Sequence, residues 1–163
     1  MSGTVKVLLA IFGILVLLLV GVAGAGYWWF KTRGADYLKD TQAAYSEGTR
    51  AGARSDEKGC YDRVIGALKT PEGATFSGSV RNGVSFSACL RAAKPVADFC
   101  DGVPAQTEFI ASATWQTRVC ASTGVASEYC TAVQGEVQKY CALPLRGAKL
   151  ARLNGGPAPG ATK

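Results

Sequence analysis

The sequence contains no histidine among its 163 residues. That absence excludes imidazole metal sites, Ser-His-Asp and Cys-His nucleophile systems, and histidine proton shuttles. No two cysteines are spaced as C-x-x-C, which excludes thioredoxin-like redox motifs, c-type haem attachment and common zinc knuckles. A phosphate-binding G-x-x-x-x-G-K-[ST] loop is missing as well. The sequence therefore predicts no catalytic residue, no metal site and no cofactor.

Three pairs of carboxylates remain as candidates for acid–base chemistry: Asp36 with Asp40, Asp56 with Glu57, and Asp98 with Asp101. A catalytic role would require a closed pocket that raises the pKa of one member. Carboxylates at turns and helix ends usually face water, and we expect that of these pairs. An apolar ligand pocket lined by Phe109, Trp115 and Tyr129 is a further candidate, although aromatic residues at helical spacing more often belong to a core.

Long apolar runs are confined to one place, the uncharged stretch of residues 7–30. Thirteen Leu, Ile, Val or Phe residues lie between Val7 and Ala25, which corresponds to a gross insertion free energy of about −4 to −8 kcal/mol. As a helix the stretch would extend about 36 Å, enough to cross a hydrocarbon core of about 30 Å. We predict a single transmembrane helix over residues 7–30, after a short N-terminus of residues 1–6.

The end of the apolar run is typical of a membrane interface. Tyr27, Trp28 and Trp29 are predicted interfacial anchors in the bilayer, and cationic residues follow them. A cleaved signal peptide is the alternative, with Ala23-Gly24-Ala25 as its cleavage site. We favour a retained anchor because the run is longer than the usual apolar region of about 7–15 residues.

Small residues occupy the last third of the predicted span. Gly21 and Ala25 form a small-xxx-small pair, and with Gly24 they leave a face that another transmembrane helix can approach closely. These three residues are the predicted helix-contact site. The alternative is that glycine and alanine are simply common in membrane spans.

Charge and cysteine content give opposite orientations. Lys6 precedes the predicted span, whereas Lys31, Arg33 and Lys39 follow it. Because cationic residues are enriched on the cytoplasmic side of a membrane, charge counting favours a cytoplasmic C-terminal side. An even number of cysteines in a small domain instead indicates a disulfide framework in an oxidising compartment. We give the cysteines more weight and predict an inner (cytoplasmic) membrane protein with its N-terminus inside. The absence of an Asn-x-Ser/Thr glycosylation site favours a periplasmic location for the rest.

Six cysteines lie in the exported part, and all are predicted to form disulfides: Cys60, Cys89, Cys100, Cys120, Cys130 and Cys141. Six cysteines allow fifteen connectivities. Cys130 and Cys141 on one helix would be about 16 Å apart, beyond the roughly 7 Å that a disulfide spans, which excludes that pair. The same argument disfavours Cys89 with Cys100. Ten residues separate Cys89 from Cys100, and ten separate Cys130 from Cys141. These matched spacings suggest that the 89–100 and 130–141 segments are joined by two disulfides.

Residues 31–143 have mostly helical spacing, which predicts a small all-α domain of about four helices on a membrane anchor. The first helical pattern is broken near Ser55-Asp56. Before the break, Ala44, Gly48 and Gly52 lie four residues apart and leave a helix face with little side-chain bulk, on which a neighbouring helix could pack. The alternative is that these glycines mark a poorly ordered helix. Residues 70–87 predict a loop or hairpin that turns at Asn82-Gly83. Further helices are expected over Cys89–Cys100, where Pro95 must start, kink or break the helix, over Phe109–Cys120, and over Cys130–Cys141.

The C-terminal segment of residues 144–163 is basic and contains no acid. Its leucines allow one or two helical turns, and the glycines and prolines after them predict a flexible tail. Arg146, Lys149 and Arg152 are candidate docking residues for anionic lipid headgroups or an acidic partner. The alternative is a solvated terminus without a partner.

These features predict a non-catalytic, single-pass accessory subunit that docks on a larger membrane protein complex. The alternative is a free-standing anchored module that binds a small ligand or peptide outside the cytoplasm. A nucleic-acid partner is not expected there.

Overall fold

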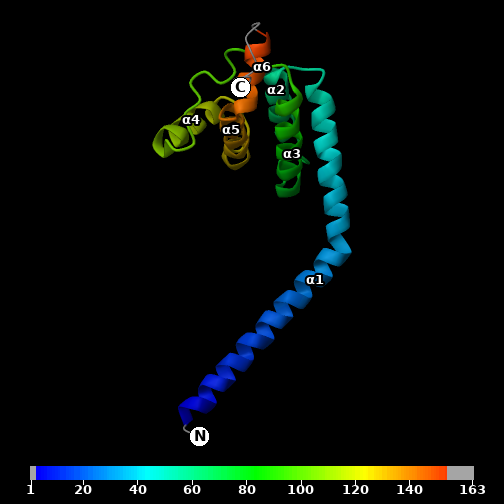
Figure 1. The fold of residues 1–163 in the computed structure, drawn as a ribbon, viewed down its shortest axis with the longest axis vertical. Coiled ribbons are helices and arrows are strands. Elements are labelled where there is room, and N and C mark those ends of the chain that lie inside the picture. Colours follow the sequence, from blue (N-terminus) through cyan, green and yellow to red (C-terminus); the bar gives the residue numbers. More distant parts are fainter. Residues whose placement is uncertain (1–2, 154–163) are drawn as a thin grey trace, which may run out of the picture. The chain divides into compact units, whose positions relative to one another are not determined.

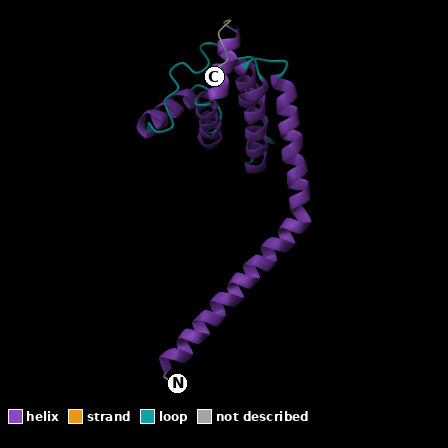
Figure 2. Ribbon diagram, in the orientation of Figure 1, coloured by secondary structure: helices purple, strands orange, loops and turns teal. Residues whose placement is uncertain are grey.

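The protein is all-α in the computed structural model, which describes residues 3–153 (Figures 1 and 2). Its elements are α1 (Gly3–Gly52), α2 (Glu57–Leu68), α3 (Phe76–Ala92), α4 (Phe109–Ala121), α5 (Ser127–Cys141) and α6 (Pro144–Leu153). The predicted fold class is confirmed, and no strand is present within residues 3–153. The predicted flexible tail falls on residues 154–163, which lie outside the described residues, as do residues 1 and 2 of the predicted N-terminus.

The chain divides into two compact units, residues 1–40 and 41–163. The first is helical, and its window Ile11–Trp28 has a mean hydropathy of 2.2 with none of its residues buried. Within the described residues this is the one helix long and apolar enough to cross a membrane. Length and composition therefore fit the predicted span, and an N-terminal signal sequence has the same properties.

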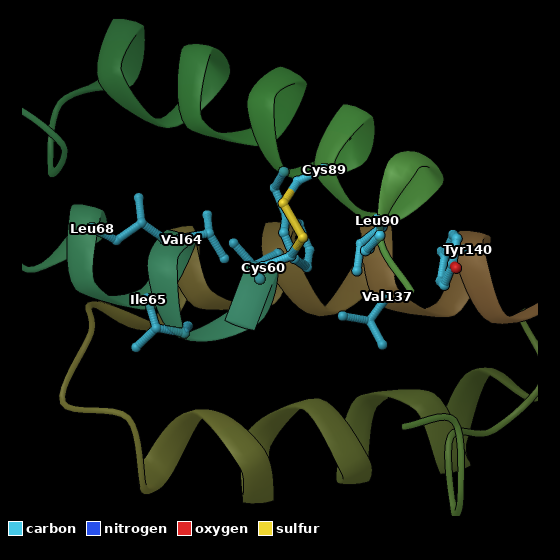
Figure 3. Close-up of a cluster of buried hydrophobic side chains, with 11 residues drawn as sticks. Cys60, Val64, Ile65, Leu68, Cys89, Leu90, Val137 and Tyr140 are labelled. Atoms are coloured by element: carbon cyan, nitrogen blue, oxygen red, sulfur yellow. A yellow bond between two sulfur atoms is a disulfide. The ribbon is translucent and has the colours of Figure 1, made fainter. Parts of the chain in front are cut away.

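The core of the second unit lies between α2, α3 and α5 (Figure 3). Its buried apolar residues come at helical spacing from each helix: Val64 and Leu68, Phe86 and Leu90, Val133 and Val137. The Cys60–Cys89 disulfide crosses this core between α2 and α3. Full burial of one large apolar side chain contributes about 1.5–3 kcal/mol, so these packed faces stabilise the three-helix arrangement.

The predicted break near Ser55-Asp56 is confirmed, because α1 ends at Gly52 and α2 starts at Glu57. Asp56 is the N-cap of α2, and its side chain accepts a hydrogen bond of 2.8 Å from the Gly59 amide. The backbone pairs with Lys94 on both sides of this cap: the Glu57 amide donates to the Lys94 carbonyl, and the Lys94 amide donates to the Ser55 carbonyl. The start of α2 is thus fixed to the segment that follows α3.

The predicted hairpin over residues 70–87 is wrong, because α3 occupies most of that stretch. Thr75 caps the helix by accepting a hydrogen bond from the Gly78 amide, and Asn82-Gly83 lies in the helix interior. Continuation of the helix buries Phe86 and Leu90, which outweighs the turn preference of Asn-Gly. The helix predicted over Cys89–Cys100 extends only to Ala92, and its end before Pro95 agrees with the predicted break, since a residue before proline disfavours helical backbone angles.

The glycine face of α1 packs closely on α3. A Cβ atom added at Gly48 would lie 2.0 Å from the Ser85 carbonyl oxygen, and one at Gly52 would lie 2.2 Å from that of Cys89. Ala44, one turn earlier, is completely buried. The predicted packing role of these small residues is confirmed, and Glu47 adds ion pairs to α2 and α3 at its side.

Replacing Gly48 by alanine is expected to lower the free energy of unfolding by about 1–3 kcal/mol, because backbone atoms of α3 cannot yield to the new methyl group. Gly66→Ala is the matched control, since a Cβ at that position on α2 meets nothing within 4 Å. The control should be neutral or stabilise the helix by up to about 1 kcal/mol. Urea unfolding of both full-length variants tests this, and equal midpoints would contradict it.

All six cysteines are paired, as predicted. The bridges are Cys60–Cys89, Cys100–Cys141 and Cys120–Cys130, with Cα–Cα distances of 5.7–5.8 Å. The expected double bridge is wrong: a single disulfide joins the 89–100 and 130–141 segments, because Cys89 faces α2 and Cys130 faces α4.

The predicted helices at residues 109–120 and 130–141 are confirmed as α4 and α5. Gly124 has a φ of +70° in the turn between them, a conformation that suits glycine. Besides the Cys120–Cys130 disulfide, polar contacts join the helices, since Gln138 donates to the Ser112 hydroxyl (2.8 Å) and accepts from Gln116 (3.0 Å).

Candidate functional site

An open apolar groove of about 910 Å³ lies on the second unit. We call it the α3–α5 groove, because most of its lining comes from those two helices. Tyr45 of α1 and Leu68 of α2 complete it. The residues that line it are Tyr45, Leu68, Phe76, Ser79, Val80, Gly83, Val84, Ser87, Arg91, Glu128, Tyr129, Ala132, Val133 and Glu136.

The α3 side of the groove is a helical stripe that sequence analysis missed. Phe76, Val80 and Val84 recur every four residues, which places them on one face of the helix. Ser79, Gly83 and Ser87 accompany them at the same period, and a Cβ added at Gly83 would meet nothing within 4 Å. The stripe therefore combines apolar side chains with open space. Its period of four was the available signal, obscured by the Asn-Gly turn pattern.

Aromatic side chains at the groove are unusually exposed. Phe76 is 80% exposed and Tyr45 is 54% exposed, while Tyr129 is partly buried. Exposed apolar residues that cluster at a groove indicate a surface that another molecule covers. Charged residues lie at its margin: Glu128 and Glu136 on α5, and Arg91 near the end of α3. Glu136 forms an ion pair with Lys139 on its own helix (2.7 Å).

The aromatic residues proposed to line one ligand pocket do not come together. Tyr129 lines the α3–α5 groove, and Trp115 lines a separate hollow of about 460 Å³ that also includes Tyr61 and Phe99. Phe109, at the start of α4, is 80% exposed. The groove is therefore the structure's candidate for ligand or partner binding, and it contains one of the three predicted residues.

Three of the six candidate acid–base carboxylates make contacts within the domain: Asp56, Glu57 and Asp98. Asp56 caps α2, and Asp98 forms an exposed ion pair with Lys58 (2.8 Å). That pairing lowers the pKa of Asp98, through its hydrogen bond with Lys58. Asp36 and Asp40 belong to the first unit and are exposed.

Glu57 differs from the expected water-facing residue, because it is completely buried. Its carboxylate accepts from the Arg146 guanidinium at 2.9 Å, and from the Val96 amide at 2.8 Å. Arg146 also donates to the Val96 carbonyl at 2.7 Å. This cluster joins α2, α6 and the segment after α3, and a buried charge of this kind is tolerated because it is paired and hydrogen-bonded.

Tyr140 lies beside this ion pair, and its hydroxyl is buried without a hydrogen-bond partner within residues 3–153. Burial raises the pKa of Tyr140 well above its ordinary value, and the neighbouring Glu57 carboxylate raises it further. The side chain therefore stays protonated at neutral pH and contributes as a core residue.

The predicted docking residues have different surroundings. Arg146 is 8% exposed and bound to Glu57, so it is an internal residue rather than the surface cation that the sequence suggested. Lys149 donates to the Arg91 and Ala93 carbonyls at the end of α3, and burial lowers its pKa. Arg152 is exposed. Docking by the basic segment stays a prediction, for which Arg152 is the surface cation available on α6.

The predicted helix-contact residues are open. A Cβ added at Gly21 or Gly24 meets nothing within 4 Å, and Ala25 is exposed. Among the predicted anchors, Tyr27 and Trp28 are about 70% exposed, and the side chain of Trp29 lies outside the described ones. A helix contact and interfacial anchoring stay predictions. No protein-family model, curated protein or solved structure matches this chain.

Proposed function

We propose that the protein is a single-pass membrane-anchored accessory subunit that docks on a larger membrane protein complex and stabilises it without catalysing a reaction. The main supporting observation is an apolar window of 18 residues, none of which is buried by the rest of the chain. The same chain also contains a helical domain with three disulfides. An unburied apolar helix of this length suits a bilayer, and its small-residue face suits a neighbouring helix.

The proposal places the N-terminus in the cytoplasm and the second unit outside the inner membrane. Three disulfides support this orientation, because such bonds persist in oxidising compartments and are rare in the cytosol. The non-catalytic assignment is supported by how Asp56, Glu57 and Asp98 are used: they cap a helix or pair with cations of the same domain. Arg152 would add a contact to anionic headgroups or an acidic partner.

Purification of the full-length tagged protein in mild detergent, followed by mass spectrometry, tests the proposal. Stoichiometric membrane partners, together with three intact disulfides, are the expected result. A protein that purifies alone would overturn the subunit assignment. Free thiols in the purified protein would overturn the orientation.

Enlarging the helix-contact face should release the partners. Gly21→Leu with Ala25→Leu fills the space that a close helix contact requires, and we expect at least a tenfold loss of co-purified partner. Ala23→Leu is the control, since it also introduces a leucine, but about 160° to 200° around the helix from those positions. Partner recovery, normalised to the amount of membrane-inserted protein, is the measurement. Equal recovery with both variants would count against a contact at this face.

A second function is favoured by the α3–α5 groove alone. Its volume of about 910 Å³ falls in the range of small-molecule sites, so a free-standing module could use it for a small ligand or peptide. The purification separates the two functions, because this second one predicts a protein without stoichiometric membrane partners.

A further inference from the structure

We propose that the α3–α5 groove receives an apolar helix of the partner protein, oriented by cationic side chains on the flank that faces α5. The inference names the docking surface of the second unit and rests on the proposed function as an accessory subunit.

The groove has the dimensions of a helix-binding surface. Its α3 stripe runs from Phe76 to Arg91, fifteen residues along one helix, which corresponds to about 22 Å or four helical turns. Ser79, Gly83 and Ser87 give this stripe a face without bulky side chains, on which an incoming helix can lie closely. The elongated, open form differs from an enclosed pocket and matches the helix-in-groove mode of recognition.

Exposed aromatic residues provide the apolar contacts. Phe76 and Tyr45 are more than half exposed, and Tyr129 lines the groove from α5. Large aromatic side chains near the centre of an interface commonly contribute most of its binding free energy. Covering these three residues with aliphatic side chains would remove from water the apolar surface that the domain leaves exposed.

The charges that line the groove differ between its two sides, with Glu128 and Glu136 on α5 and Arg91 near the end of α3, and this difference orients the partner helix. Glu128 and Glu136 lie eight residues apart on α5, about 12 Å along the helix. Glu128 has no ion pair within the described part of the chain, and the Lys139 partner of Glu136 is itself 61% exposed. Cations spaced seven or eight residues apart on the incoming helix would complement both carboxylates. An anionic lipid headgroup would meet these two carboxylates and a single cation, Arg91, so it suits the groove less well.

A second copy of this chain is a poorer occupant. Its basic helix is α6, and α6 is already fixed to its own domain by the Arg146–Glu57 ion pair and the contacts of Lys149 with the end of α3. Use of α6 in the groove of a neighbour would break both. The occupant is therefore a helix from another protein.

The test uses full-length protein in phosphatidylcholine nanodiscs, with empty nanodiscs as the background. The probe is a synthetic 18-residue amphipathic peptide with a leucine and alanine face and two lysines eight positions apart. A twin peptide carries glutamates in place of the lysines. Gly83→Leu fills the groove at a position where the added Cβ meets nothing, and Gly66→Leu makes the same change at an exposed position outside it.

We expect the lysine peptide to bind the wild-type protein and Gly66→Leu equally, and to bind Gly83→Leu at least tenfold more weakly. The glutamate twin should bind the wild type several-fold more weakly than the lysine peptide. Equal binding to the two leucine variants would overturn the groove assignment, and equal binding of the two peptides would overturn the cationic partner. Far-ultraviolet circular dichroism of Gly83→Leu shows that a loss of binding is not a loss of fold.

Co-purification distinguishes this inference from the proposed function. If no membrane partner purifies with the wild type but the lysine peptide binds as expected, the accessory role fails and the groove assignment stands. If partners purify equally with the wild type and Gly83→Leu, and the peptides do not distinguish the variants, the groove assignment fails and the accessory role stands.

Discussion

Replacing Arg146 by alanine is expected to lower the free energy of unfolding by about 3–5 kcal/mol, one of the largest effects of any single substitution in this domain. The Glu57 carboxylate is completely buried, and the side chain of its partner Arg146 is 10% exposed. Removal of the guanidinium would leave a buried negative charge without a cation, and would also leave the Val96 carbonyl with only the Phe99 amide as its donor. Both losses occur away from water, which could otherwise solvate the groups.

The surface pair of Lys58 and Asp98 provides the control for this prediction. Its two side chains are more than half exposed, so Lys58→Ala should change the unfolding midpoint far less. The double variant Glu57→Gln with Arg146→Met should recover part of the loss, because it removes both charges together. Thermal and urea unfolding of the full-length protein measure these differences. An Arg146→Ala effect no larger than that of Lys58→Ala would contradict a stabilising role for the buried Glu57–Arg146 ion pair.

The same substitution should release α6 before the rest of the domain unfolds. Arg146 lies on α6, and Glu57 lies at the start of α2, so their ion pair is the main charged link between the two helices. Hydrogen exchange should therefore accelerate in Pro144–Leu153 more than in α3 or α5. This local effect distinguishes a lost attachment from general destabilisation.

Patterns within one helix made much of the fold predictable. The apolar window of α1, the break before α2, and the positions of α4 and α5 follow from local spacing. The stretch of α3 was misread because its Asn-Gly pair has a strong local turn preference. That preference was overridden by burial of Phe86 and Leu90 against helices distant in sequence, which no local pattern displays.

The candidate site depended on such distant contacts. The C-terminal segment carries basic residues and no acid, which predicts a docking role for Arg146, yet its partner Glu57 lies 89 residues away. The α3–α5 groove likewise needs two helix faces placed side by side, and either face alone resembles an ordinary amphipathic helix. Spacing predicted that every cysteine would be bonded, while the choice of partners followed from the packing of α2 with α3 and of α4 with α5.

Loss of the Cys100–Cys141 disulfide is expected to destabilise the domain more than loss of either other bridge. It closes the longest loop, with a sequence separation of 41 against 29 and 10. Chain-entropy arguments assign about 4 kcal/mol to a loop of that length and about 3 kcal/mol to the shortest. This disulfide also attaches the segment between α3 and α4, through Cys100, to the end of α5 at Cys141.

The paired variants Cys100→Ser with Cys141→Ser, and Cys120→Ser with Cys130→Ser, test this order by urea unfolding of the full-length protein. The first should have the lower midpoint, and equal or reversed midpoints would contradict the loop-length argument.

Because the expected loss is comparable to the whole stability of many small domains, the first variant should also accumulate poorly in cells. A domain this dependent on its bridges would fold badly where thiols stay reduced, so alkylation of cysteines in intact cells connects its stability to its compartment. Fully alkylated wild-type protein would contradict an extracytoplasmic domain, and protected cysteines would support one.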